Sequence, residues 1–201
     1  MGNHYYTNDP IENKKEHTFA YTYQKSTLKF QAGSGVFSKK GIDFGTHVLL
    51  QALPTFEDAQ DVLDVGCGVG VVGLSIAKVY PQIHVDLVDV NVSALAYASQ
   101  NATTNKIKNV AIFESDVYQN INKLYDCVIT NPPIRAGKAV VDAIVLGAKE
   151  YLKKGGMLWL VIAKKQGAPS MMKRIQEVYG NCEVVSKESG YFVLTACNTS
   201  V

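Results

Sequence analysis

The chain has 201 residues, of which 47% are hydrophobic and 19% are charged, and its formal net charge is +2. This composition is typical of a globular protein, and the length suffices for one domain that buries roughly 70% of its unfolded surface. The small charge does not demand a nucleic-acid partner, although basic residues clustered on one face would permit one. The longest apolar run, Met157 to Ala163, is too short to span a bilayer, so we expect no membrane segment.

The four cysteines form neither a CxxC pair nor a metal-ligand spacing, so we predict no metal site and a reducing, cytoplasmic location. The amino terminus, Met1 to Tyr6, lacks the apolar core of a signal peptide. We expect a single domain over 1–201. Within it, 1–16 would be a loose lead-in, 17–54 a hairpin and a helix, and 61–197 an α/β core.

Two alternating stretches, 19–23 and 27–30, predict the small N-terminal β-hairpin, and a helix over 46–53 should stop at Pro54. From residue 61 strands and helices alternate, and the strands are continuous apolar runs, as in a parallel sheet covered on both faces. The predicted strands are 61–66, 83–89, 110–115, 125–130 and 156–163, and the predicted helices are 70–80, 92–104, 137–153 and 168–179.

The last two apolar segments, 182–185 and 191–195, are joined by a short polar turn. A parallel pair needs a long crossover, so this link predicts an antiparallel hairpin at the carboxyl terminus. Together the segments predict an α/β fold, a doubly wound and mostly parallel seven-stranded sheet.

A glycine-rich loop follows the first core strand and opens a helix, with Gly66, Gly68 and Gly70 in sequence. Glycines allow a ligand to approach the backbone, and a helix start offers unpaired N–H groups. Gly68 to Gly73 also fits the dinucleotide pattern GxGxxG, which leaves NAD as an alternative cofactor. Asp89 ends the second strand, where it would accept ribose hydroxyls of either cofactor or, alternatively, cap the helix that starts near residue 92.

Two further carboxylates help to distinguish NAD from a cofactor that contains a methionine moiety. Asp64 lies two residues before the first glycine, where dinucleotide folds normally have an apolar residue, and it could face the ammonium group of a methionine moiety. Asp116 ends the third strand, where it could accept from an adenine amino group or simply be solvated.

The tetrapeptide Asn131-Pro132-Pro133-Ile134 follows the fourth apolar strand. Prolines lack an N–H and fix φ, which leaves carbonyl acceptors at a rigid turn, and the Asn carboxamide adds another acceptor. Such acceptors suit an exocyclic NH2 group, although a plain Pro-Pro turn is the other reading of the dipeptide. Because ligands of doubly wound sheets bind at the carboxyl ends of the strands, all these polar groups should converge on one crevice.

These residues, over about 17–197, resemble a class I S-adenosylmethionine-dependent methyltransferase. The stretch from Gly35 to Thr46, taken with Asn-Pro-Pro, resembles the small methyltransferase domain family, which includes ribosomal RNA guanine-N2 methyltransferases of the RsmC kind. The resemblance implies S-adenosyl-L-methionine as cofactor, with Phe37 and Thr46 lining its pocket. It also implies methyl transfer to an exocyclic amine, with guanine N2 of small-subunit ribosomal RNA, or of its assembly particle, as the first choice.

In that reading Asn131 and the Pro132 carbonyl accept the two amine hydrogens, and no strongly basic residue is required. Ile134 departs from the family, which usually has a base-stacking aromatic residue there, so Arg135 could stack on the base instead. RsmC-like enzymes also carry an additional amino-terminal domain. The remaining residues expected to bind substrate are Pro133, Lys138, Lys164 and Lys165.

The sequence is compatible with other functions as well. Adenine or a protein glutamine amide offers the same amine, and the protein could be a monomer or a homodimer. A nicotinamide-dependent oxidoreductase fits the GxGxxG match but gives Asn131 no role. A non-catalytic RNA-binding assembly factor would have kept the fold and lost turnover.

Overall fold

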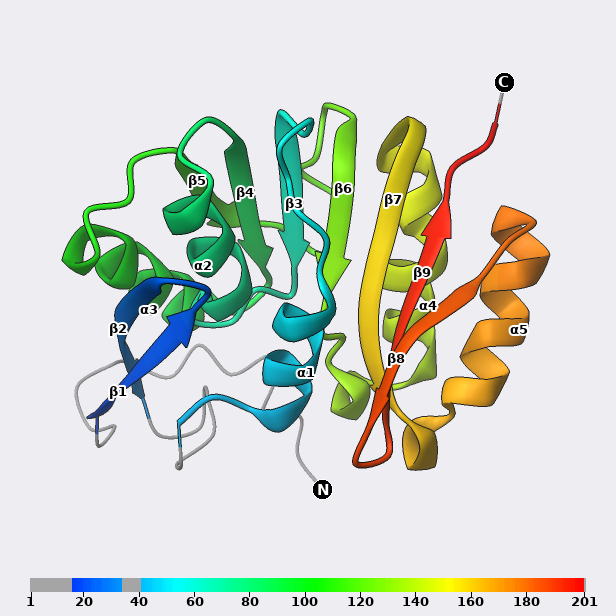
Figure 1. Cartoon of the computed structure of the whole chain (residues 1–201), viewed down its shortest axis with the longest axis horizontal. Helices are drawn as coiled ribbons and strands as arrows, with labels where there is room; N and C mark the ends of the chain where they lie inside the picture. The colour runs from blue at the N-terminus through cyan, green and yellow to red at the C-terminus, as the bar shows by residue number, and fades with distance from the viewer. Residues whose placement is uncertain (1–15, 34–40, 201) are drawn as a thin grey trace.

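The computed structural model describes residues 16–33 and 41–200. Within these ranges the chain forms a seven-stranded sheet of order β5-β4-β3-β6-β7-β9-β8 and a separate two-stranded sheet of β1 and β2 (Figure 1). The strands β3 (Asp61–Val65), β4 (His84–Asp89), β5 (Val110–Glu114), β6 (Tyr125–Thr130) and β7 (Leu152–Ala163) run parallel. The predicted fold class is therefore confirmed.

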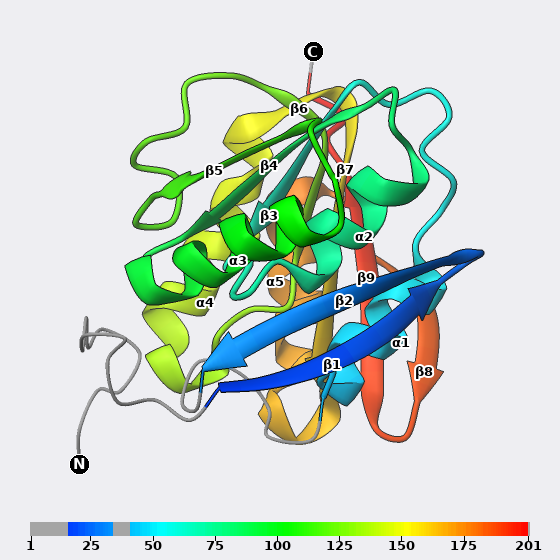
Figure 2. The ribbon, with the colours of Figure 1, turned by 90° about the vertical axis from the view of Figure 1, so that its left-hand side faces the viewer.

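The carboxyl-terminal hairpin is also confirmed. Strand β9 (Tyr191–Cys197) lies antiparallel to both β7 and β8 (Glu183–Glu188). The predicted N-terminal hairpin is β1 (Glu16–Tyr23) paired antiparallel with β2 (Ser26–Gly33). Figure 2 shows this hairpin beside α2 (Val71–Val79) and α3 (Val92–Thr104) rather than in the main sheet.

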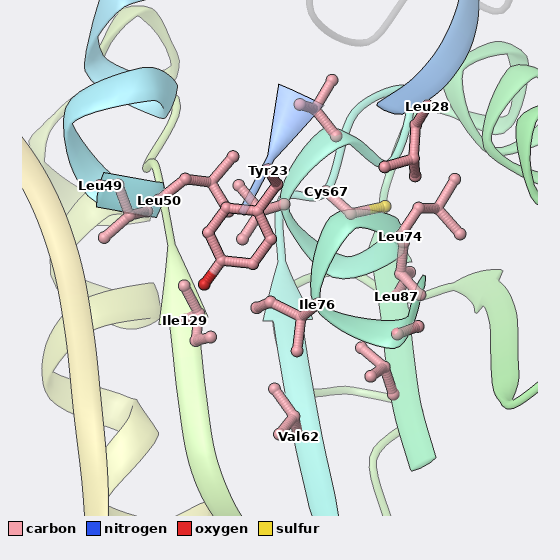
Figure 3. Packing of buried hydrophobic residues seen from close by; sticks show 14 of the residues in the cluster. Tyr23, Leu28, Leu49, Leu50, Val62, Cys67, Leu74, Ile76, Leu87 and Ile129 are labelled. Carbon is pink, nitrogen blue, oxygen red and sulfur yellow. The ribbon is translucent and has the colours of Figure 1, made fainter. Parts of the chain in front are cut away.

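Helices cover both faces of the sheet. The helices α1 (Phe44–Ala52), α2 and α3 lie on one face, and α4 (Lys138–Gly147) and α5 (Ala168–Tyr179) lie on the other. Figure 3 shows the first core, where Leu49 and Leu50 of α1 lie near Ile129 of β6 and Leu74 of α2 lies beside Leu87 of β4. A second apolar cluster fills the space under α4 and α5 and includes Val145, Leu160 and Ile175. Both faces are thus apolar, which explains the continuous apolar strands.

The bounds of two predicted helices need correction. The first helix begins at Phe44 rather than at residue 46, because Asp43 caps it by accepting a hydrogen bond from the Thr46 N–H at 3.1 Å. The helix predicted over 137–153 ends at Gly147, and a short 3-10 helix (Ala148–Tyr151) leads into β7.

Strand β7 itself begins four residues earlier than predicted. Gly155 and Gly156 look like a break in the sequence, but they form an irregularity inside the strand, where the register with β6 shifts between Tyr125 and Cys127. Gly155 has φ of +80°, and a Cβ on Gly156 would lie 2.9 Å from the Lys153 carbonyl oxygen. A bulge of this kind needs glycine, and it lets the strand continue past it.

Candidate functional site

The glycine loop between β3 and α2 lies at the carboxyl edge of the sheet. Gly66 and Gly68 have φ of +71° and +56°, which L residues with a side chain rarely adopt. The N–H groups of the loop glycines are already engaged: Gly66 donates to the Val88 carbonyl at 2.9 Å and Gly68 donates to Asp89 Oδ2 at 2.8 Å. The loop therefore presents backbone to a ligand without offering its glycine N–H groups to a phosphate.

Asp64 lies beneath this loop and is fully buried. Its Oδ2 accepts a hydrogen bond from the Gly73 N–H in the first turn of α2 at 2.8 Å. Burial raises the pKa of Asp64 to about 7; the Gly73 bond acts against the rise, and the nearby Asp89 charge adds to it. A Cβ on Gly73 would lie 2.7 Å from Leu87 Cγ, so this third glycine is needed for close packing of α2 on β4.

Asp89, at the end of β4, is nearly as buried. Its Oδ2 accepts a hydrogen bond from the Gly68 N–H at 2.8 Å, and its Oδ1 accepts one from the Asn91 N–H at 2.9 Å. Burial raises its pKa in spite of these backbone bonds. The alternative that Asp89 caps α3 is wrong, because Asn91 is the capping residue and accepts from the Ala94 N–H at 3.2 Å.

Asp116 is exposed and lies two residues beyond the end of β5, since that strand stops at Glu114. Together with Asp89 it lines a depression that we call the Asp89 hollow, bordered by Val65, Gly66, Asp89, Ser115, Asp116 and Pro133 among others. The structure thus brings the glycine loop and the ends of β4 and β5 together. The individual ligand contacts of Asp64, Gly70, Asp89 and Asp116 stay predictions.

Asn131 follows β6, whose last residue Thr130 bonds to the Val65 carbonyl at 2.8 Å. The Asn131 side chain donates from Nδ2 to Asp43 Oδ2 and to Thr46 Oγ1, both at 2.9 Å. Thr46 is buried, and its hydroxyl group accepts the hydrogen bond from Asn131. Thr46 is not among the described residues that line the Asp89 hollow. Its predicted cofactor contact stays a prediction.

The two prolines lie between two depressions. Pro133 borders the Asp89 hollow, and its Cδ is 3.7 Å from the position that a Cβ on Gly66 would take. Pro132 and Pro133 also border a second depression, the Asn131 hollow, which is lined by Asp43, Asn131, Pro132, Pro133, Ile134, Arg135, Gln166 and Tyr191. Pro133 is common to the described linings of both hollows, so a ligand in one hollow would approach a ligand in the other at this residue.

Among the described residues, one of the two proline carbonyls has a hydrogen-bond partner and the other has none. The Pro133 carbonyl is taken by the Ala136 N–H at 2.9 Å in a short 3-10 helix (Ile134–Ala136), which corrects the expectation that both carbonyls are open. No hydrogen bond between described residues involves the Pro132 carbonyl or Asn131 Oδ1. These two oxygens are the acceptors that the amine interpretation requires.

The basic residues divide into two groups. Arg135, Lys164 and Lys165 are exposed, and none of them forms an ion pair with a described residue. Lys138 instead donates to Asp142 Oδ2 at 2.9 Å, on a groove between α4 and α5 where Arg174 pairs with the same carboxylate. Their predicted contacts with substrate stay predictions, and Lys138 has a competing partner.

Phe37, the other predicted cofactor residue, lies outside the described residues. Sequence reasoning gave no role to Asp43 or Tyr191, which both border the Asn131 hollow. An Asp three residues before Thr46 is a recognisable helix-cap pattern that could have identified Asp43. Tyr191 gives no such local pattern, because β9 reaches this edge only through the antiparallel hairpin.

Over the described ranges, no three His, Cys, Asp or Glu side chains gather in a way that would hold a metal ion. In the same part of the chain, none of the helices has the length and apolar character needed to cross a membrane.

Comparison with known proteins agrees with this geometry. Residues 27–195 match the family model described as "Methyltransferase small domain". The chain is 40% identical to the uncharacterized protein YbxB of Bacillus subtilis over 98% of each chain. It is 30% identical to ribosomal RNA small subunit methyltransferase C of Aliivibrio fischeri, over 87% of this chain and 51% of that protein.

Among solved structures, the 16S rRNA N2 methyltransferase RsmC of T. Thermophilus, in complex with AdoMet and guanosine, superposes with a TM-score of 0.80 at 25% identity. The match covers 94% of this chain and 52% of that one. The chain therefore spans about half the length of the methyltransferase C relatives that it matches.

Proposed function

Because the chain belongs to the methyltransferase small domain family, whose methyl donor is S-adenosylmethionine, we propose that it methylates an exocyclic amine, guanine N2 of ribosomal RNA. The observation that carries this proposal is the pair of acceptors Asn131 Oδ1 and the Pro132 carbonyl, which have no hydrogen-bond partner among the described residues and lie near a hollow lined by Asp89 and Asp116. An NH2 group has two hydrogens to donate to such a pair.

The carboxyl groups at and beneath the glycine loop fit S-adenosylmethionine better than a dinucleotide. Asp64 and Asp89 are buried carboxylates with raised pKa values and, among the described residues, no cationic partner, so they favour a ligand that carries positive charge. Asp89 already occupies the Gly68 N–H, one of the loop N–H groups that a pyrophosphate would approach. This arrangement weighs against the nicotinamide alternative.

In this assignment Asp89 would hold the ribose hydroxyls, Asp64 the ammonium side and Asp116 the adenine amino group. S-adenosylmethionine supplies an electrophilic methyl group on a sulfonium sulfur. Asn131 Oδ1 and the Pro132 carbonyl would accept the two amine hydrogens, which draws the nitrogen out of conjugation with the ring and directs its lone pair. Positioning of this kind contributes about 7–11 kcal/mol to lowering a bimolecular barrier.

No strong base is required for the last proton. The acceptor nitrogen becomes acidic once it is methylated, and it loses its proton to solvent. Among the described residues that line the Asn131 hollow there is no histidine or lysine, in agreement with a reaction that relies on hydrogen-bond acceptors.

The choice of guanine N2 rests on the relatives. The methyltransferase C proteins are named for ribosomal RNA, and the RsmC complex contains guanosine. Exposed Arg135, Lys164 and Lys165 near the same edge would contact RNA phosphates. Adenine N6 or a glutamine amide would present the same hydrogens, and Ile134 does not distinguish among them.

Two experiments test the proposal. Calorimetric titration should give binding of S-adenosylmethionine and none of NADH; the opposite result would overturn the cofactor assignment. Mass spectrometry of ribosomal RNA nucleosides should then find N2-methylguanosine missing at one site in cells that lack the protein. An unchanged nucleoside profile would overturn the RNA substrate.

A further inference from the structure

Asn131 has both of its donor hydrogens occupied by the protein. A carboxamide carries two N–H hydrogens and one carbonyl oxygen. The Nδ2 atom lies 2.9 Å from Asp43 Oδ2 and 2.9 Å from Thr46 Oγ1, so each hydrogen has a partner. The reverse orientation of the amide would place Oδ1 against a carboxylate oxygen with no hydrogen between them. The Asp43 charge therefore fixes which way the amide faces.

We propose that Asp43 and Thr46 are positioning residues that hold Asn131 as a hydrogen-bond acceptor only. The consequence for the substrate class rests on the proposed function: the methyl acceptor must carry N–H hydrogens. A guanine N2, an adenine N6 or a side-chain amide satisfies Oδ1. A ring nitrogen without hydrogen, such as guanine N7, would bring its lone pair against Oδ1 and be rejected.

The positioning pair is itself held firmly. Asp43 Oδ2 also accepts from the Thr46 N–H at 3.1 Å as the cap of α1, so the same oxygen fixes the helix start and the Asn131 amide. Phe44, the first residue of α1, packs against the Tyr191 ring with centroids 5.6 Å apart. A Cβ on Gly45 would lie 2.9 Å from Tyr191 Cε1, so helix and strand β9 are in close contact. The packing of α1 on β9 therefore fixes the positions of Asp43 and Thr46 beside Asn131.

The hydrogen bonds can be tested without any substrate. In the ¹⁵N–¹H spectrum the Asn131 side-chain amide is identified by its loss in Asn131→Ala. We expect two separate resonances that exchange slowly with water, and at least tenfold faster exchange in Asp43→Ser. Serine is chosen because it keeps a helix cap while removing the carboxylate. Thr46→Ser keeps the hydroxyl group and serves as the matched control, with exchange unchanged.

Kinetics separate positioning from a merely structural role. We expect Asp43→Ser to lower kcat about tenfold at unchanged affinity for S-adenosylmethionine, and Asp43→Asn, which keeps an oxygen at the same reach, to retain more of the rate. If Asp43→Ser unfolds at the assay temperature, Thr46→Val replaces it, because valine removes one of the two partners with little change in shape.

The outcomes distinguish a failure of the positioning role from a failure of the proposed RNA methyltransferase function. Rapid amide exchange in the wild-type protein, or exchange that Asp43→Ser leaves unchanged, overturns the positioning role. A protected amide in a protein that methylates no RNA overturns the proposed substrate and leaves the positioning role intact. Efficient methylation of RNA at guanine N7 would overturn the restriction to N–H acceptors.

Discussion

The two edges of the sheet use carboxylates in opposite ways. At the amino edge Asp61, Asp86 and Asp126 pair with Lys123 and Lys153 at 2.9–3.4 Å, and His84 joins Asp86 at 2.9 Å. At the carboxyl edge Asp64 and Asp89 bond only to backbone N–H groups among the described residues, and Asp43 to a backbone N–H and the Asn131 amide.

The pKa values follow this difference. Burial raises the pKa of Asp61 and of Asp126, but hydrogen bonds from lysines and, for Asp126, from backbone N–H groups outweigh it and leave both values lowered. Backbone N–H groups offset the burial of Asp64 and Asp89 only in part, and the pKa values of both are raised. The amino edge therefore stabilises the fold, whereas the carboxyl edge holds buried carboxyl groups whose ionised form a cationic ligand would stabilise.

The largest effect should come from the amino edge. Asp86→Ala leaves the buried Tyr125 hydroxyl without its acceptor at 2.7 Å and removes a partner of Lys123, so we expect a loss of about 3 kcal/mol in the free energy of unfolding. Urea denaturation measures it, with exposed Asp58→Ala as a control that changes stability by less than about 0.5 kcal/mol. A parallel fall in affinity for S-adenosylmethionine would contradict the separation of the two edges.

At the carboxyl edge the same kind of substitution should affect binding. Asp89→Ala removes the charged acceptor of the ribose hydroxyls, and about 2 kcal/mol, or roughly 30-fold in the Kd of S-adenosylmethionine, should be lost. Calorimetry measures the change. Glu114, the exposed register partner of Asp89 on β5, provides the control, because Glu114→Ala should leave the Kd within about twofold. Equal effects of both substitutions would show that the charge acts only at long range.

Asn131→Ala separates binding from turnover. It removes one of the two amine acceptors, and we expect kcat to fall at least about tenfold, a loss of ~1.4 kcal/mol, while the cofactor Kd changes little. Single-turnover methylation measures the rate. A variant that transfers methyl groups at the wild-type rate would remove the role assigned to the carboxamide.

The pH dependence of the free energy of unfolding tests the raised pKa of Asp64. With its folded pKa raised to about 7, Asp64 keeps its proton in the folded state while it is ionised in the unfolded state. The free energy of unfolding should therefore fall as the pH rises from about 4 to 7, and less so in Asp64→Asn. Asp61 and Asp126 act oppositely: their lowered pKa values give stability above about pH 4 that is lost as the pH falls below it.

The affinity for S-adenosylmethionine should also depend on the ionisation of Asp64. Binding of S-adenosylmethionine, whose ammonium favours ionised Asp64, should tighten several-fold between about pH 5.5 and 7.5. Adenosine lacks the ammonium and should show no such change, and neither should the Asp64→Asn variant. An identical pH profile for both ligands would place the titrating group elsewhere.

The smallest effect concerns the exposed cations. Lys164→Ala with Lys165→Ala should weaken RNA binding evenly across sequences and lower the slope of log K against log salt by about 0.7 for each lost contact with single-stranded RNA. Lys138→Ala should lower it less, because Lys138 already pairs with Asp142. A fall of about 0.7 for Lys138→Ala, as large as for one full phosphate contact, would show that this pair opens when RNA binds.

Sequence pattern was sufficient for the fold because periodicity and turn residues are local. The alternation of strands and helices, the glycine loop and the terminal hairpin all follow from neighbouring residues. It failed at Gly155 and Gly156, where a bulge inside a strand looks like a break. At the site, Asp89 and Asn131 could be predicted from the strands that they end. The contact of Asp43 with Asn131 could not, since 88 residues separate them and only the packing of α1 on the sheet brings them together.

The most direct test is a crystal structure of the protein with S-adenosylhomocysteine and guanosine. We predict the nucleoside product in the Asp89 hollow and the guanine N2 atom within hydrogen-bond distance of both Asn131 Oδ1 and the Pro132 carbonyl oxygen. An empty Asp89 hollow, or a guanine that turns a ring nitrogen toward Asn131, would contradict the account.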